Sequence, residues 1–216
     1  MIHPSELVLN SDGSIYHLKL HPEQLAKEVI LVGDPGRVSL ISSYFDRLDH
    51  RVENREFITH TGELNGKGIS VIATGIGTDN IDIVLNELDA LVNVDLEKRE
   101  IKSAQEKLRL LRIGTCGSIQ PDVLADQVVL SSYAVGLDGL LNYYDWQAKQ
   151  EEEDLLQAFL KHCKWPTNMN APYLVGGSDA QIKRFGGIEG VNQGITLTAP
   201  GFYGPQGRSI RLQPAL

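Results

Sequence analysis

The sequence has few cysteines, and their spacing suits neither a cross-link nor a metal site. Cys116 and Cys163 are the only two in 216 residues, and neither belongs to a CxxC or a histidine-rich motif. A disulfide framework or a structural zinc site needs a denser and more regular spacing of ligands. We therefore expect two free thiols in a reducing compartment, and no metal site.

Long apolar runs and an excess of positive charge are also missing. No apolar segment approaches the roughly 18 to 20 residues that cross a bilayer, and the N-terminal MIHPSELVLNSDGS lacks the pattern of a signal peptide. The formal net charge of -8 argues against a surface for nucleic acid or for an anionic membrane. These features predict a soluble, cytoplasmic protein that binds any anion through a few local groups.

Two nucleotide-binding motifs are missing as well. The chain has no GxxxxGK[ST] and no GxGxxG with a suitable acidic residue downstream, which disfavours a nucleotide triphosphatase and a Rossmann dehydrogenase. What is present, 42% hydrophobic and 22% charged residues over 216 positions, suits one α/β core. We expect a single domain over residues 1–216.

The first half of the chain alternates short apolar strands with glycine-rich loops and helices. A predicted strand over residues 28–32 runs into Gly-Asp-Pro-Gly, and a helical pattern follows over residues 37–45. A second strand, over residues 68–73, leads into TGIGTDN, whose Thr78 or Asp79 is placed to cap a helix that starts at Ile81. Because ligands bind at the carboxyl ends of strands in an open α/β sheet, these loops predict a binding site.

The remaining elements follow the same rules. Asn65-Gly66 predicts a hairpin turn, and the charged stretch Asp95–Lys107 predicts a solvated connection or surface arm. A third strand, over residues 108–113, runs into the glycine loop GTCGS. Further strands are expected over residues 127–131, 173–176 and 194–199, and a helix over residues 152–162.

The three glycine loops carry groups that suit a phosphate. Glycine lets backbone N–H groups approach an oxyanion, and GDPGR adds Arg37 while LRIGT adds Arg112 and the Thr115 hydroxyl. Guanidinium forks, a hydroxyl and glycine N–H groups are typical ligands of phosphate. Each motif alone is weak, because most glycine turns are only turns. Arg112 is the most informative residue, because an arginine near the end of an apolar strand must be paired or bind something.

Taken in order, these motifs resemble the nucleoside phosphorylase family, and most closely its uridine phosphorylase branch. The resemblance covers essentially the whole chain, with Asp95–Lys107 as an insertion. It implies a three-layer α/β/α fold around a central mixed twisted sheet. The motifs are SDGSIYHLKL, VGDPGRV, ENREF, IATGIG, LRIGTCGSIQPDV, GLDG and FYGPQGR.

The resemblance also implies roles for individual residues. Gly33, Arg37, Arg112 and Thr115 would hold inorganic phosphate. Arg55 of NREF would complete the phosphate site of a neighbouring subunit, and His17 of YHL would reach the ribose end of that site. Without the resemblance, a salt-bridged strand residue and a surface histidine would be equally good interpretations of these two.

The loop FYGPQGR would read the base. The resemblance implies that Gln206 and Arg208 bind the polar edge of uracil and that Phe202 packs beside the base or sugar. Leaving this Gln and Arg unpaired against another base would be costly, so a pyrimidine is favoured.

The implied reaction is reversible phosphorolysis of uridine to uracil and ribose 1-phosphate. Inorganic phosphate would be the co-substrate, no organic cofactor would be needed, and family members can carry a monovalent cation near the residue that is Glu56 here. The same resemblance implies a homodimer as the minimal unit and a homohexamer, a trimer of dimers, as the assembly. No nucleic acid or membrane partner is expected.

One departure from the family leaves alternatives open. Family members continue beyond FYGPQGR into a Glu-Met-Glu segment that binds the ribose hydroxyls and into a C-terminal helix, which this sequence does not contain. The alternatives are a purine-preferring phosphorylase, a nucleosidase that uses water, and an inactive chain that only binds nucleoside or phosphate. Phosphate dependence and the choice between uridine and inosine separate them.

Overall fold

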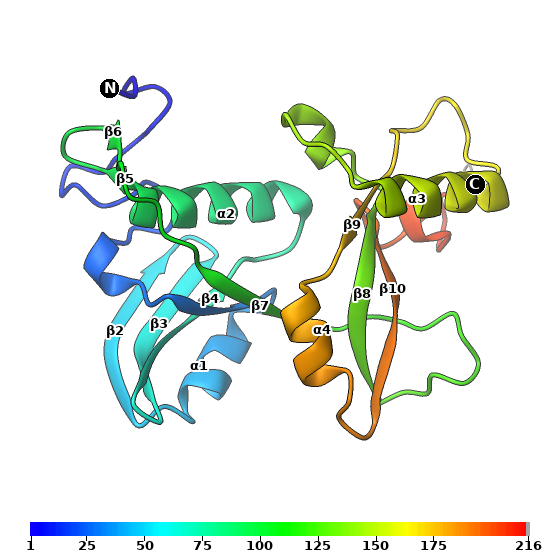
Figure 1. Cartoon of the computed structure of the whole chain (residues 1–216), viewed down its shortest axis with the longest axis horizontal. Helices are drawn as coiled ribbons and strands as arrows, with labels where there is room; N and C mark the ends of the chain where they lie inside the picture. Colours follow the sequence, from blue (N-terminus) through cyan, green and yellow to red (C-terminus); the bar gives the residue numbers. More distant parts are fainter. Residues whose placement is uncertain (215–216) are drawn as a thin grey trace. The chain divides into compact units, whose positions relative to one another are not determined.

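The computed structural model describes residues 1–214, and the chain divides into two compact units (Figure 1). Unit 1 is Met1–Thr115 and unit 2 is Cys116–Leu216. No helix of the described residues has the length and apolar character needed to cross a membrane. That the two units act as the single domain predicted above stays a prediction.

Unit 1 is built on a five-stranded mixed sheet in the order β2-β3-β4-β1-β7. The central strand β1 (Glu28–Val32) runs parallel to both neighbours, β4 (Lys67–Ala73) and β7 (Arg109–Ile113). The strands β2 (Arg47–Asn54) and β3 (Phe57–Leu64) extend the sheet in antiparallel fashion. The hairpin turn at Asn65-Gly66, both at positive φ, joins β3 to β4 as predicted.

Two helices cover the sheet, α1 (Gly36–Ser42) on one face and α2 (Thr78–Asn93) on the other (Figure 1). The expected helix cap at Thr78 or Asp79 is wrong, because Gly77 precedes the helix as its N-cap. Gly77 has a φ of 110°, a conformation that L residues rarely adopt, so the chain turns into α2 earlier than the apolar pattern suggested.

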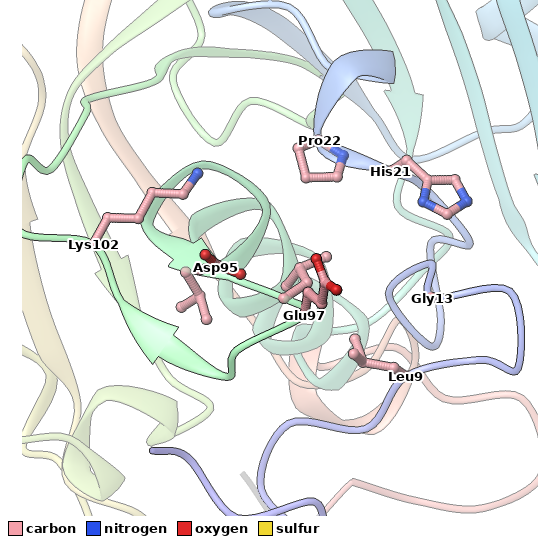
Figure 2. A pocket seen from close by; sticks show the side chains of 9 residues that line it. Leu9, Gly13, His21, Pro22, Asp95, Glu97 and Lys102 are labelled. Carbon is pink, nitrogen blue, oxygen red and sulfur yellow. The ribbon is translucent and has the colours of Figure 1, made fainter.

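The charged stretch after α2 is mostly exposed, as predicted, but it begins with a small hairpin. The short strands β5 (Val94–Asp95) and β6 (Glu100–Ile101) pair in antiparallel fashion, and Asp95 accepts hydrogen bonds from Lys98 at the turn. A hollow of about 430 Å³ lies between this hairpin and the N-terminal segment (Figure 2). Its lining includes Leu9, His21, Leu96, Glu97 and Lys102.

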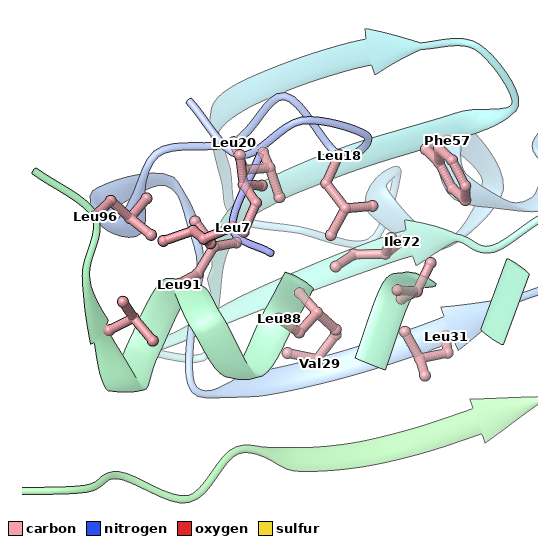
Figure 3. Packing of buried hydrophobic residues seen from close by; sticks show 13 residues of the cluster. Leu7, Leu18, Leu20, Val29, Leu31, Phe57, Ile72, Leu88, Leu91 and Leu96 are labelled. Atoms are coloured by element: carbon pink, nitrogen blue, oxygen red, sulfur yellow. The ribbon is translucent and has the colours of Figure 1, made fainter. Parts of the chain in front are cut away.

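The main hydrophobic core lies between the sheet and α2 (Figure 3). Alternate residues of β1 point to opposite faces: Val29 and Leu31 join the core under α2, whereas Val32 packs with Val38 of α1. The irregular N-terminal segment, which includes the short 3-10 helix η1 (Pro22–Gln24), closes the core from a third side. Its contributions are Leu7, Ile15, Leu18 and Leu20.

Unit 2 contains a three-stranded sheet in the order β10-β8-β9. The long strand β8 (Val128–Gly136) runs parallel to β10 (Val191–Thr198) and antiparallel to β9 (Tyr173–Gly176). The helices are α3 (Gln150–Cys163) and α4 (Asp179–Phe185), with short 3-10 turns η2 (Leu140–Tyr143) and η3 (Gly204–Gln206). The structure thus confirms the α/β class with mixed sheets.

A buried carboxylate joins the start of α3 to β9. Glu152 is 4% exposed and accepts the backbone N–H groups of Lys149 and Gly176 at 2.7 and 2.8 Å. The N–H of Gly176, more than that of Lys149, holds the pKa of Glu152 below its usual value. The side chain therefore enters the interior of unit 2 with hydrogen bonds to both of its oxygens.

Candidate functional site

The three glycine-rich loops predicted from the sequence meet in unit 1. In the sheet, Val32 at the end of β1 lies between Ala73 of β4 and Ile113 of β7. Because these strands are parallel and neighbours, the loops that follow them leave the sheet at the same edge and the same level. This confirms the expectation that they gather into one site.

The loops surround a pocket of about 700 Å³. A volume of this size lies within the range of small-molecule sites. The pocket contains four of the five residues predicted to hold phosphate, with Arg55 as the exception. Its lining is Gly33, Asp34, Pro35, Arg37, Glu56, Gly75, Ile76, Gly77, Asn80, Arg112, Gly114 and Thr115.

Two arginines give the pocket its positive charge. Arg37 lies in the first turn of α1, and Arg112 lies near the end of β7. Among residues 1–214, neither guanidinium has a hydrogen-bond or ion-pair partner from the protein, unlike Arg109 of the same strand, which pairs with Glu28. Arginines whose five donors are unused can take up an anion without breaking an existing contact.

Glycines make the space that Arg112 occupies. A Cβ added at Gly114 would lie 2.5 Å from Nη1 of Arg112, and one added at Gly33 would lie 3.8 Å from its Nη2. The absent side chains therefore let the guanidinium lie against the backbone of two loops. The N–H groups of these loops and the exposed Thr115 hydroxyl are further donors beside it.

The pocket also contains carboxylates that the phosphate prediction did not include. Asp34 accepts the N–H of Gly36 at 2.9 Å, which holds the GDPG turn closed. Glu56 lines the pocket close to Gly75, where an added Cβ would lie 3.1 Å from its Cγ. The start of α2 lies at the same pocket, through Gly77 and Asn80, and its free N–H groups add positive potential.

Arg55 and His17 lie outside this pocket and close to each other. Arg55 has a φ of 55°, and its guanidinium lies 5.3 Å from the centre of the Tyr16 ring and 3.3 Å from the Tyr16 hydroxyl. Asn54 donates a 2.7 Å hydrogen bond to the backbone carbonyl of His17. The structure therefore brings the two residues together in one cluster, apart from the other predicted phosphate ligands of the same chain.

Glu87 is a member of this cluster that the sequence did not indicate. Its carboxylate on α2 contacts the backbone N–H and the Nδ1 of His17, the latter at 2.7 Å. Seventy positions separate the two residues, and nothing in the local pattern of α2 distinguishes Glu87 from the other acidic residues of that helix.

The three predicted base-reading residues lie together in unit 2. Arg208 donates to the carbonyl of Phe202 at 2.9 Å, donates to Oε1 of Gln206, and lies 4.2 Å above the Phe202 ring. Gln206 in turn donates to the carbonyl of Gly201 at 3.2 Å. The turn η3 and these contacts order the loop, and Phe202 is 60% exposed.

Within residues 1–214, no group of three His, Cys, Asp or Glu side chains has an arrangement that could hold a metal ion. Glu56, beside which a monovalent cation was predicted, lines the pocket described above.

Comparison with solved structures finds the same fold. The nucleoside phosphorylase of Trypanosoma brucei, described as showing uridine phosphorylase activity, matches with a TM-score of 0.79 and 30% identity, covering 95% of this chain and 72% of that one. A uridine phosphorylase of Phytophthora capsici matches with a TM-score of 0.61 and 23% identity, over 96% of this chain and 70% of that one.

Comparison of sequences agrees with the comparison of folds. The uridine phosphorylases of Thermococcus kodakarensis and Escherichia coli are 35% and 36% identical over 133 and 132 residues, which is 62% and 60% of this chain. Those matches cover 43% and 46% of the relatives, so the chain spans about half the length of the curated relatives it matches. The family model of the phosphorylase superfamily matches residues 27–215. The chain therefore belongs to the phosphorylase superfamily.

Proposed function

We propose that this chain carries the substrate sites of an enzyme that splits uridine with inorganic phosphate into uracil and ribose 1-phosphate. The observation that carries the proposal is the pocket of unit 1, where Arg37 and Arg112 lie beside the Thr115 hydroxyl and glycine N–H groups and have no side-chain partner within residues 1–214. The named relatives support the reaction class.

The proposed chemistry depends on positioning and charge. Arg37, Arg112 and Thr115 hold phosphate as the nucleophile, so that one of its oxygens attacks C1′ of the sugar. The bond between C1′ and the base nitrogen breaks, its electron pair leaves with the base, and the new bond joins C1′ to the phosphate oxygen. The departing uracil takes up the proton that hydrogen phosphate gives up when it becomes the sugar phosphate.

The loop that carries Gln206 and Arg208 supports a pyrimidine as the base. An amide and a guanidinium within hydrogen-bond reach of each other offer donors and an acceptor side by side, which matches the alternating edge of uracil. In the proposed reaction these donors also stabilise the negative charge that develops on the departing base.

We propose that Arg55 and His17 act in the site of a second copy of this chain. Both lie outside the pocket of their own unit, in one cluster with Tyr16, which supports a role across an interface. The proposal includes a homodimer as the minimal unit, a hexamer of three such dimers, a cytoplasmic location and a monovalent cation near Glu56.

The first test is the release of uracil from uridine by this chain, with and without inorganic phosphate. We expect release that depends on phosphate and that exceeds the release of hypoxanthine from inosine. Release without phosphate would show a nucleosidase, faster turnover of inosine would show a purine enzyme, and binding without release would show an inactive chain.

The second test compares the substitution of one pocket arginine with the substitution of a matched control arginine outside the pocket. Arg112→Ala should weaken phosphate binding, measured by calorimetry, by roughly 10- to 100-fold, the worth of charged hydrogen bonds. Arg109→Ala, on the same strand but paired with Glu28, should bind phosphate like the parent. Equal binding by all three proteins would contradict the assigned pocket.

The third test concerns the shared site. Arg55→Ala and Arg112→Ala proteins, each inactive alone, should recover part of the activity when they are mixed under conditions of subunit exchange. Exchange shown by native mass spectrometry without any recovery would rule out Arg55 acting across subunits.

A further inference from the structure

Glu87 binds the His17 segment through three N–H groups. Its Oε1 accepts from the backbone N–H of His17 at 2.9 Å and contacts His17 Nδ1 at 2.7 Å, and its Oε2 accepts from the N–H of Leu18 at 2.8 Å. The Glu87 side chain is 12% exposed, so these contacts are shielded from competing water. One carboxylate thus fixes both the backbone and the imidazole at this position.

The chemistry of this contact determines which nitrogen of His17 carries the proton. An ionised carboxylate can only accept hydrogen bonds, so Nδ1 must be the donor. In the neutral imidazole Nε2 then has a free lone pair, and it has no protein partner within residues 1–214. A hydrogen-bonded second nitrogen is the general means by which proteins choose a histidine tautomer.

Neighbouring groups hold the ring in one orientation. The Tyr16 ring lies edge-on at 4.8 Å and the Phe57 ring at 6.4 Å between centroids. Asn54 donates to the carbonyl of His17 at 2.7 Å. The imidazole is 28% exposed, so part of it remains accessible. Glu87 could bind the two backbone N–H groups without touching the ring. Its additional contact with Nδ1 therefore indicates that it also acts on the imidazole.

We propose that Glu87 is a positioning residue that keeps His17 in the Nδ1-protonated tautomer and so presents Nε2 as an acceptor for a hydroxyl group of the nucleoside sugar. The identity of that hydroxyl group rests on the proposed function; the tautomer and its control by Glu87 do not.

The direct test is the ¹⁵N NMR spectrum of the imidazole nitrogens in this chain, recorded at a series of pH values so that the neutral form of His17 is observed. In that neutral form we expect the proton on Nδ1 and none on Nε2. Glu87→Gln introduces an amide that can donate as well as accept, so both tautomers should become populated. Asp89→Asn, on the same helix and in contact with Asn93 instead, should leave the His17 signals unchanged.

The kinetic test separates positioning from folding. Glu87→Gln should raise KM for uridine about tenfold, the worth of one hydrogen bond, and leave the affinity for phosphate unchanged. In a His17→Ala background the same substitution should have no further effect. Circular dichroism controls for folding, and Glu87→Asp provides a variant that keeps the carboxylate.

The outcomes distinguish the two proposals. A neutral His17 that carries its proton on Nε2 in the parent, or an unchanged tautomer in folded Glu87→Gln, would overturn the role of Glu87 whatever the activity. A tautomer that behaves as expected in a chain without phosphate-dependent turnover would support the role of Glu87 and count against the proposed reaction of this chain.

Discussion

Gly114 illustrates how a residue without a side chain can control a binding group. An added Cβ would lie 2.5 Å from Nη1 of Arg112, whose flexible end can move away. Gly114→Ala should therefore displace the guanidinium at little cost in stability and weaken phosphate binding about tenfold, measured by calorimetry.

Gly117 provides the control for that substitution in the same loop. A Cβ there meets nothing within 4 Å, so Gly117→Ala should bind phosphate like the parent. Equal affinities for the two alanine variants would mean that the position of Arg112 does not determine phosphate binding.

His60 gives unit 1 a dependence on pH. It is 6% exposed, its Nδ1 lies 2.7 Å from the Ser42 hydroxyl, and Arg51 lies across the strand pair β2–β3 with Glu53 as a weaker, opposing charge. Burial, reinforced by Arg51, lowers the pKa of His60 from 6.5. The unfolded chain therefore binds a proton more readily than the folded chain as the pH falls through 6.5.

The expected result is a free energy of unfolding that declines as the pH falls below about 6.5 and is unaffected by His60 above it. In His60→Gln, urea unfolding at a series of pH values should show a smaller decline. His162→Gln, at an exposed position, should keep the decline of the parent. A parallel decline in the parent and in His60→Gln would exclude this histidine as the cause.

Residues that belong to recognisable motifs could be predicted, even where two motifs are distant in sequence, but a contact whose partner lies outside any motif could not. Gly33, Arg37, Arg112 and Thr115 follow from glycine loops with charged neighbours, and the structure brings them into one pocket. The contact between His17 and Glu87 depends on the fold of the N-terminal segment over α2, which has no local signature.

At the scale of elements, apolar pattern and turn residues predicted the parallel strands, the hairpin and the long helices. β2 was not predicted because it is an edge strand whose charged and apolar residues alternate between exposed and half-buried, without an apolar run. α4 was also missed, because it has seven residues and none of them is buried. A half-exposed edge strand and a short helix without buried residues both carry little of the hydrophobic pattern that prediction uses.

Helix α2 offers a stability test within one element. Leu88 is 1% exposed in the main core, whereas Leu85, on the same helix, is 39% exposed. Leu88→Ala should lower the free energy of unfolding by about 2–5 kcal/mol, because it leaves a cavity. Leu85→Ala should lower it by less than about 1 kcal/mol. Equal losses in denaturant unfolding would contradict the assigned packing of α2.

At the scale of the whole molecule, burial is divided unevenly between the two units. Both hydrophobic clusters belong to unit 1, and the buried hydrophobic residues of unit 2 are Val135 and Leu174 within the described residues. Apolar side chains of the unit 2 sheet, such as Val128 and Leu197, are 59% and 49% exposed in the single chain. A unit with few buried contacts opens more readily than one with a full core.

Hydrogen exchange should reveal this difference. We expect slow amide exchange in β1, β4 and the buried side of α2, and faster exchange in β8, β9 and β10, as measured by mass spectrometry of peptides. Uniform protection of both units would mean that unit 2 gains its stability from contacts outside the single chain, and protection that grows with protein concentration would identify a second copy as their source.

The pocket of unit 1 joins loops that follow three different strands, each separated from the next by a helix or a hairpin. An anion held by Arg37 and Arg112 would act as a removable cross-link between these segments and would relieve the repulsion between two unpaired cations. At a phosphate concentration one hundred times its Kd, such a link stabilises the folded chain by about 2.7 kcal/mol. Melting temperatures of this protein will therefore depend on whether the buffer is phosphate, and a phosphate titration of the melting curve measures occupancy of the pocket without any catalysis.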